Sequence, residues 1–334
     1  MRLLKLVPDT TNIPFLRVRH RAVGLSALLL LGSLLLVAVR GLNFGVDFAG
    51  GLMIEARFEG PAELERLRAA VNRLGVGQAA LQSFGAPDTV LIRLPAPPGD
   101  AEAVDAAVKR VLGALRGLDP SVEIRRVETV SGKVSGELVR KGALAILFAM
   151  VGISLYIWLR FEWQFGVGAL LALVHDVGLT LGFFALTRLE FNLSTVAAIL
   201  TIVGYSLNDT IVIYDRIREN LRKYRRMDMV SLLDLSVNET LARTIVTSLT
   251  MILALGALVL FGGEVLFGFS VAMLIGIVIG TYSSIFIAAP LLVWMGVGPD
   301  SFVTKPAGPE GAERVPGRAP EPGKAPGRPR GSQP

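Results

Sequence analysis

Six apolar segments, each long enough to cross a lipid bilayer as a helix, constrain the fold of this chain more than any other feature. They cover residues 22–39, 142–159, 165–187, 193–214, 245–261 and 266–295. A helical span requires about 20 mostly apolar residues, and inside a bilayer its backbone polar groups must pair within the helix. We therefore predict an all-α polytopic membrane protein with six transmembrane helices, which excludes a water-soluble enzyme.

The first and last of these segments each allow a second interpretation. The first follows Arg17, Arg19 and Arg21, as a signal peptide would, but no A-x-A site follows it. Its apolar run also exceeds the roughly 7–15 residues of a signal core, so we interpret it as an uncleaved span. The last segment is 30 residues long, and we expect it either to tilt or to bend before Pro290.

The distribution of positive charge predicts the orientation. Lys and Arg number five in residues 1–21, seven in the connection after the fourth span and six in the C-terminal tail. The loops at 188–192 and 262–265 carry one and none. Because positive residues concentrate on the cytoplasmic side, we expect both termini to be cytoplasmic. The net charge of +6 then requires no nucleic acid partner.

Residues 41–141 form a predicted external domain between the first two spans. The segment holds 13 acidic and 13 basic residues, and a loop of this length crosses the membrane regardless of charge. Alternating or apolar runs predict strands at 52–58, 79–84, 88–94 and 122–130, and helical spacing predicts helices at 61–74 and 101–115. The β-α-β-β-α-β order is that of a ferredoxin-like α+β domain.

The chain therefore divides into four parts. Residues 1–40 are the cytoplasmic N-terminus and first span, 41–141 the external domain, 142–296 the remaining five spans, and 297–334 a cytoplasmic tail. The tail is rich in Pro and Gly and cannot bury a core, so we expect it to be disordered.

The connection at 215–240 is predicted to be amphipathic and cytoplasmic. Ile217 and Leu221 recur at helical spacing among the basic residues of 215–226. This pattern favours a helix on the membrane surface. A solvated extension of the fourth span is the alternative.

Ionisable residues inside the predicted spans are candidates for function, because a mid-membrane charge costs about 2.5–3.5 kcal/mol on insertion scales. His175 and Asp176 lie near the middle of the third span, and Asp209, preceded by Asn208, lies in the cytoplasmic half of the fourth. Arg243 lies at the start of the fifth. For His175 a packing role is the alternative, which the adjacent Asp176 weakens.

Two polar helix faces bear opposite charges at matching depth. The fourth span presents Thr201, Tyr205, Asn208 and Asp209, and the fifth presents Arg243, Thr247 and Thr250. We therefore expect Asp209 and Arg243 to form a buried pair. A proton-coupling site and a purely structural ion pair are both compatible with this pattern.

Small residues recur at every fourth position of the sixth span: Ala272, Gly276, Gly280 and Ser284. Such a stripe allows close helix packing but does not identify the partner helix. Enzymatic chemistry has no support, because the chain has no Cys, only two His and no GxxxxGK[ST] loop. We expect no metal, no cofactor and no enzyme activity.

Several motifs resemble those of a known family. They are NFGVDFAGG at 43–51, VSGEL at 134–138, HDV at 175–177, GYSLNDTIVIYDRIREN at 204–220, NETLARTIVTS at 238–248, FGGEVLFGF at 261–269 and GTYSSIFIAAPLL at 280–292. Together they resemble the SecF family of protein-export membrane subunits, which belongs with SecD to the resistance-nodulation-division (RND) superfamily. The run at 204–220 is highly specific. The resemblance covers about residues 43–294 and does not include the tail.

The resemblance implies one six-span half of an RND-type bundle that pairs with SecD, and association with the SecYEG translocation channel and its accessory membrane subunits. The pair would use the proton-motive force, without a cofactor, to assist late steps in the export of unfolded preproteins. The family's proton-conduction residues correspond to Asp209 and Arg243, and its span-three aspartate region to His175 and Asp176. Protonation of Asp209 would weaken its attraction to Arg243, and the resulting helix shift would reach the external domain through the first span.

Two competing functions share these features. Half of an RND-type proton-driven small-molecule efflux transporter would carry the same intramembrane charges, although such pumps usually hold two six-span units and larger external domains in one chain. That function predicts drug sensitivity on deletion with normal secretion. A non-conducting scaffold instead predicts that neutral replacements of Asp209 are harmless.

Overall fold

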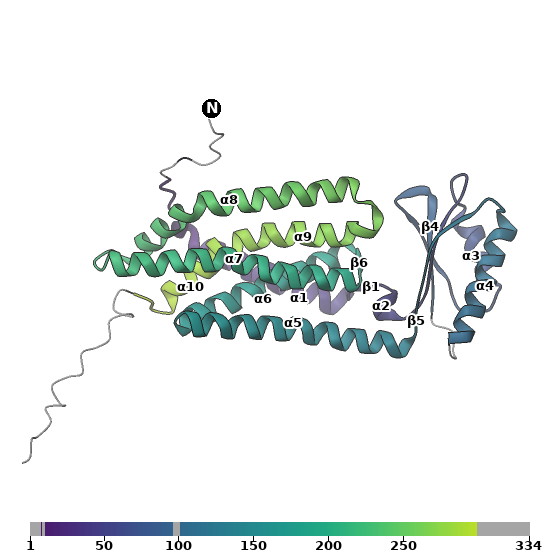
Figure 1. The fold of residues 1–334 in the computed structure, drawn as a ribbon, viewed down its shortest axis with the longest axis horizontal. Helices are drawn as coiled ribbons and strands as arrows, with labels where there is room; N and C mark the ends of the chain where they lie inside the picture. The colour runs from purple at the N-terminus through teal and green to yellow at the C-terminus, as the bar shows by residue number, and fades with distance from the viewer. Residues whose placement is uncertain (1–7, 9–10, 96–100, 299–334) are drawn as a thin grey trace, which may run out of the picture.

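The computed structural model describes residues 8, 11–95 and 101–298, so almost all of the predicted tail lies outside the described residues. Long helices form a bundle, and an α+β domain inserted between the first two spans stands at one end of it (Figure 1). Within the described residues, six helical segments are long and apolar enough to span a membrane. The predicted six-span fold class is confirmed.

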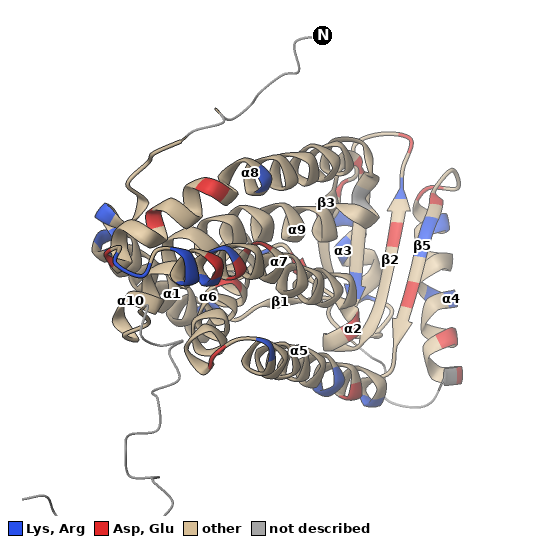
Figure 2. Cartoon of the chain, turned by 60° about the vertical axis from the view of Figure 1, so that its left-hand side comes forward, with Lys and Arg blue, Asp and Glu red and all other residues tan. Residues whose placement is uncertain are grey.

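The bundle has two central helices and several peripheral ones. Its elements are the 3₁₀ turn Phe15–Val18, α1 Arg19–Arg40, α5 Gly132–Arg160, α6 Trp163–Thr187, α7 Leu193–Lys223, α8 Met229–Phe261, α9 Gly263–Ser283 and α10 Ala289–Trp294. Helices α6 and α7 are the most buried, whereas α1 and α5 expose large apolar side chains along their length. Charged residues gather toward the ends of the bundle and in the inserted domain (Figure 2). This is the distribution that a lipid environment favours.

The last span changes geometry before Pro290, where the sequence predicts either a tilt or a bend. A π-helical turn, Ser284–Ala288, separates α9 from α10. Proline has no backbone N–H and its ring clashes with the preceding turn, and a π turn accommodates such a disturbance. The fully buried Tyr214 hydroxyl donates to the Ala288 carbonyl oxygen at 3.2 Å, which ties the turn to α7.

The connection between α7 and α8 differs from the predicted helix on the membrane surface. Helix α7 runs without interruption to Lys223, and α8 begins at Met229. The apolar side chains Ile217 and Leu221 are buried inside the bundle instead of facing lipid headgroups. The Asn220 amide donates to Ser236 of α8 at 3.0 Å. Packing between the two helices therefore accounts for the amphipathic pattern.

The inserted domain is a four-stranded antiparallel sheet with two helices on one face (Figure 1). Its elements are β2 Gly51–Arg57, α3 Leu64–Asn72, β3 Ala80–Phe84, β4 Ala86–Leu94, α4 Ala101–Leu118 and β5 Glu123–Val130. The sheet order β3-β4-β2-β5 is the ferredoxin-like arrangement expected from the element order. Leu52 and Ile54 face the helices, whereas Met53 and Glu55 face the bundle.

Three short elements that the sequence analysis did not predict link the inserted domain to the bundle, and we call them the joint: β1, α2 and β6. Strand β1, Asn43–Phe44, pairs in parallel with β6, Glu190–Phe191, which lies just before α7. The turn of helix α2, Val46–Ala49, then leads into β2. Gly50 and Gly51 have φ values of 70° and 123°, which glycine adopts without the steric cost that other residues incur.

Candidate functional site in the helix bundle

A buried polar cluster forms around Asp176, whose side chain is fully excluded from solvent on α6. One carboxylate oxygen lies 2.9 Å from Nδ1 of His175. The other accepts hydrogen bonds from the hydroxyl of Ser206 on α7 and from that of Ser283 on α9, the latter at 2.8 Å. Three helices therefore meet at one carboxylate, which is supplied with donors on both oxygens.

The cluster depends on very close contact between α7 and α9. A Cβ atom added at Gly280 would lie 2.9 Å from Cβ of Ser206, and one added at Gly276 would lie 2.3 Å from Ile202. The predicted small-residue stripe therefore faces α7 of the same chain. Ser284 is also buried there, and its hydroxyl donates to the Thr281 carbonyl oxygen at 3.0 Å.

His175 extends the cluster toward α1. Its ring lies 6.3 Å from the ring of Tyr282, centroid to centroid. The Tyr282 hydroxyl lies 3.0 Å from the hydroxyl of Ser26 and 3.2 Å from the Ala22 carbonyl oxygen, both on α1. The second ring nitrogen of His175, Nε2, is buried and has no hydrogen-bond partner among the described residues.

Asp209 is the second buried carboxylate, and its surroundings are different. It is 2% exposed on α7, and its Oδ2 atom accepts no hydrogen bond from the part of the chain that the structure describes. Two further buried polar atoms lack partners on the same pair of packed helices, the hydroxyls of Tyr205 on α7 and Thr244 on α8. Tyr205 precedes Asp209 by one helical turn, so both belong to one helix face.

The expected contact between Asp209 and Arg243 is not formed. Arg243 acts electrostatically on Asp209, but no ion pair within 4.0 Å joins them among the described residues. The reason is geometric: Arg243 lies on an exposed face of α8, whereas Asp209 points into the protein. Thr201 and Asn208 on α7 are also exposed. The Thr247 hydroxyl donates a hydrogen bond within α8, to the Arg243 carbonyl oxygen at 2.9 Å.

The two carboxylates have different chemical capacities. The Asp176 carboxylate has polar partners on both oxygens, which is the usual condition of a buried polar group. Asp209 in its ionised form is buried with one oxygen unpaired, so binding a proton removes an uncompensated charge. Of the two, Asp209 is the carboxylate with an oxygen left unpaired among the described residues.

The joint with the inserted domain is attached to the same helix that carries Asp209. The Asp47 carboxylate accepts a hydrogen bond from the backbone N–H of Leu193, the first residue of α7, at 2.9 Å. Glu190, just before α7, forms an ion pair with Arg93 of β4. Burial raises the pKa of the Glu190 carboxyl, although Arg93 acts in the opposite direction.

Sequence reasoning missed several of these residues. Ser206 and Ser283 were not predicted as partners of Asp176, although Ser206 lies one turn from Asp209 on the predicted polar helix. Asp47 and Glu190 were also missed. Their positions in the sequence could have indicated them. Asp47 lies where the first span leads into the external domain, and Glu190 lies in the short loop before the fourth span.

The fold and this site define a class: a polytopic membrane protein with one α+β domain between its first two spans and two buried carboxylates in its bundle. Comparison with known proteins specifies the family. Residues 110–298 match the model of the C-terminal part of the protein export membrane proteins SecD and SecF, and residues 35–62 match the SecD/SecF GG motif. The chain belongs to the SecD/SecF family of protein-export membrane proteins.

Relatives within this family match along most of the chain. It is 46% identical over 290 residues to protein translocase subunit SecF of Rickettsia rickettsii (strain Sheila Smith), covering 86% of this chain and 94% of the relative. The SecF subunit of Rickettsia conorii (strain ATCC VR-613 / Malish 7) matches to the same extent. The chain is therefore similar to SecF subunits and has a SecF role in protein export.

Solved structures of SecDF show the same fold. The crystal structure of SecDF, a translocon-associated membrane protein from Thermus thermophilus, matches with a TM-score of 0.78 and 35% identity over 87% of this chain. A SecDF structure in a super-membrane-facing form matches with a TM-score of 0.62. This chain spans only 40% of the length of either SecDF chain.

Proposed function

We propose that this chain uses the proton-motive force, together with SecD, to assist late steps of preprotein export through the SecYEG channel. The observation that carries the proposal is Asp209, a buried carboxylate with an unpaired oxygen in a membrane-spanning helix. Natural proteins keep few buried polar groups unpaired, and those that persist call for an explanation such as a bound water or a functional role. A carboxylate that binds and releases a proton meets that requirement.

In this proposal the charge of Asp209 controls the packing of α7 against α8. When Asp209 is ionised it attracts Arg243, and a proton on Asp209 removes that attraction. One proton that moves through 100 mV supplies about 2.3 kcal/mol, which corresponds to more than a tenfold bias between two states. That is enough to shift a packed helix between two positions.

The movement reaches the inserted domain along α7 as well as through the first span. Helix α7 is continuous from Leu193 to Asp209, and Leu193 is bonded to Asp47 of the joint. Glu190 adds the ion pair with Arg93 of the sheet. A displacement of α7 would therefore pull directly on the domain that is proposed to contact the emerging polypeptide.

A partner with its own spans is expected to cover the polar stripe on α7 and α8. Thr201, Asn208, Arg243 and Thr250 are exposed on these helices, and lipid tails offer no hydrogen bonds to such groups. A SecD subunit that supplies a second six-span unit would pair with them, and SecDF relatives contain more than twice the length of this chain. We further propose accessory subunits of the channel and unfolded preproteins as contacts.

The proposed location is the bacterial cytoplasmic membrane with both termini in the cytoplasm. The alternating distribution of Lys and Arg supports it. The inserted domain then faces the outside, where the polypeptide emerges. The chain catalyses no covalent reaction in this proposal and uses the proton gradient instead of a cofactor.

The test is the release of a stalled, partly exported preprotein from membrane vesicles, with and without an imposed proton gradient. Asp209→Asn preserves size and removes the titratable group, so we expect the protein to accumulate normally and to lose gradient-dependent acceleration. Asp215→Asn is the matched control, because Asp215 lies on the same helix with a side chain 66% exposed. If Asp209→Asn vesicles still respond to the gradient, Asp209 is structural and the proton-coupling proposal is wrong.

A further inference from the structure

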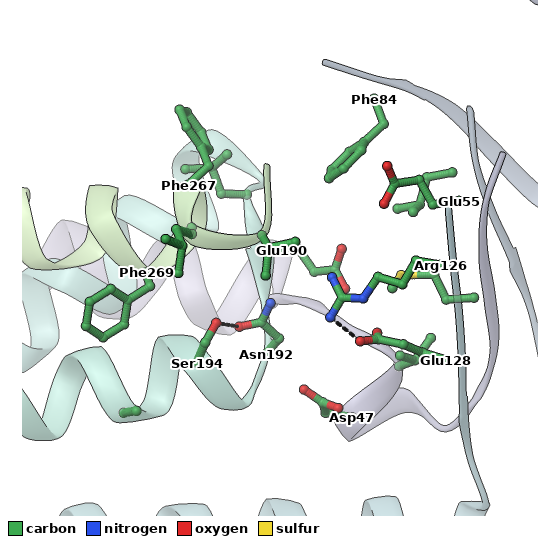
Figure 3. A pocket seen from close by; sticks show the side chains of 18 residues that line it. Asp47, Glu55, Phe84, Arg126, Glu128, Glu190, Asn192, Ser194, Phe267 and Phe269 are labelled. Carbon is green, nitrogen blue, oxygen red and sulfur yellow. Dashed lines mark hydrogen bonds and ion pairs between the residues drawn. The ribbon is translucent and has the colours of Figure 1, made fainter. Parts of the chain in front are cut away.

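A cavity of about 560 Å³ lies between the inserted domain and the end of the bundle that faces it. One wall is the sheet face opposite α3 and α4. The other walls are α2, the start of α7 and the first turns of α9 (Figure 3). Aromatic residues contribute to the lining on both sides, Phe84 from β3 and Phe267 and Phe269 from α9, and the Phe269 ring points away from Glu55 toward the bundle. Its volume is within the range of about 300–1,000 Å³ that is typical of ligand sites.

The charges that line the cavity are predominantly negative. They are Asp47, Glu55, Glu128, Glu190 and Arg126. Three of the carboxylates have partners within the chain: Glu128 bonds Arg126, Glu190 bonds Arg93 and Asp47 bonds the Leu193 amide. The remaining carboxylate, Glu55, has no partner among the described residues and is the candidate contact for a bound ligand.

Glu55 is buried, unpaired and directed into the cavity. It is 8% exposed on β2, and its carboxylate makes no hydrogen bond or ion pair with any described residue. Arg126 is its cross-strand neighbour on β5, but the guanidinium is bonded to Glu128 (Figure 3). Glu55 is one of the lining residues, so its carboxylate is available to a ligand that enters the cavity.

The lining specifies the chemistry of the occupant. A negative, partly aromatic cavity suits a cation carried on an apolar stem, which can contact both a carboxylate and ring faces. A metal ion is not the expected occupant, because no three His, Cys, Asp or Glu residues in the described part of the chain are placed to hold one. Lysine and arginine side chains have the required form.

We propose that this cavity binds an extended polypeptide segment, with a Lys or Arg side chain against Glu55 and a neighbouring apolar side chain among Phe84, Phe267 and Phe269. The inference rests on the proposed function, in which unfolded polypeptide emerges on this side of the bundle. Because the cavity contacts both the sheet and the start of α7, a movement of α7 would change its shape. Binding and release would then alternate with the proton cycle.

Binding can be measured by fluorescence anisotropy with the purified full-length chain and the membrane subunits that co-purify with it. The probes are a labelled peptide of alternating Lys and Phe and the same peptide with Glu in place of Lys. We expect the Lys peptide to bind at least about tenfold more tightly than the Glu peptide, which is about 1.4 kcal/mol. Glu55→Gln should weaken binding of the Lys peptide by a similar factor.

Glu59→Gln is the matched control, because Glu59 is exposed and lies outside the cavity lining. It should leave the affinity unchanged. Glu55 makes no hydrogen bond or ion pair with a described residue that the substitution would remove, so the Glu55→Gln protein should unfold at a temperature no lower than that of the parent. This second measurement separates loss of the site from loss of the fold.

Equal affinity of the parent and Glu55→Gln proteins for the Lys peptide would overturn the assignment. So would binding of spermidine at Glu55 without binding of the peptide, since the site would then accept small amines only. A failure of peptide binding together with intact gradient-dependent release would remove this inference and leave the proposed function standing.

In membranes, a photoreactive residue in place of Phe84 should crosslink to a stalled preprotein, whereas one in place of Arg116 should not. Arg116 is exposed on α4, on the opposite side of the sheet. Equal crosslinking at both positions would contradict a site in the cavity.

Discussion

Asp176 and Asp209 are both buried carboxylates of the same bundle, one on α6 and one on α7, but their surroundings differ in kind. Asp176 lies where α6, α7 and α9 meet and receives hydrogen bonds from Ser206 and Ser283. Asp209 lies on α7, and its Oδ2 atom has no partner among the described residues; the hydroxyls of Tyr205 on α7 and Thr244 on α8 also lack one. The Asp176 carboxylate therefore has partners on both oxygens within the described residues, and the Asp209 carboxylate does not.

This difference separates structure from function more clearly than burial does. A charge with a full set of donors stabilises one arrangement of helices, whereas an unpaired charge disfavours the arrangement that surrounds it. Under the proposed function, Asp176 would therefore belong to the fixed core of the bundle and Asp209 to the part that changes state. The following substitutions test this division.

The largest expected effect on stability is that of Asp176→Ala. It leaves two serine hydroxyls and Nδ1 of His175 without their acceptor. A hydrogen bond to a charged group contributes about 1.5–3 kcal/mol, so we expect a loss of roughly 3 kcal/mol or more. The thermal midpoint of the detergent-solubilised protein measures it, with Asp209→Ala as the comparison. If Asp209→Ala destabilises the protein as much as Asp176→Ala does, the division between the two regions fails.

A smaller effect is expected where α7 and α9 approach each other. In Gly280→Ala, the added Cβ would lie 2.9 Å from Cβ of Ser206, the residue that donates to Asp176. Overpacking of this kind costs about 1–3 kcal/mol. Gly256→Ala on α8 is the matched control, since no atom lies within 4 Å of the added Cβ, and it should stabilise the helix by about 0.5–1 kcal/mol. A Gly280→Ala protein as stable as Gly256→Ala would show that the contact is loose.

The sequence was sufficient for the framework of the protein and for the residues that carry unusual charges. Apolar length predicts the six spans, and alternation with turn signals predicts the ferredoxin-like order, because both patterns follow from local periodicity. His175, Asp176 and Asp209 are conspicuous because ionisable groups are expensive in a membrane. All three of these residues are buried in the bundle.

The sequence was insufficient to predict which side chains pair with each other, because pairing depends on how the helices are rotated against one another. Periodicity places Asp209 and Arg243 on polar faces at similar depth, but it does not show that Arg243 is exposed while Asp209 is buried. In the sequence, nothing distinguishes Glu55 from the other residues of its predicted strand. Its isolation becomes visible only when Arg126, the neighbour across the strand, is seen to bond Glu128.

The smallest expected effect concerns Glu190, a third carboxylate whose situation lies between those of Asp176 and Asp209. It is partly buried at the joint and has one partner, Arg93. Burial raises its pKa, with Glu128 and Asp47 adding to the increase and Arg93 opposing it. A carboxyl with a raised pKa binds more protons in the folded state than in the unfolded chain. Its contribution therefore makes the fold less stable as the pH rises from 4.5, its ordinary value, toward the raised value.

Glu190→Gln removes this titration, so the thermal midpoint of the parent should rise more than that of the variant when the pH is lowered from about 7 to about 5. Comparison of the two profiles cancels the contributions of all other titrating groups. Glu123→Gln, an exposed position on β5, is the control and should follow the parent profile. The opposite result, in which the parent loses stability relative to Glu190→Gln at the lower pH, would mean that the ion pair with Arg93 outweighs burial. Glu190 would then belong with Asp176, among the carboxylates that the fold fully satisfies, and the joint would be a rigid attachment.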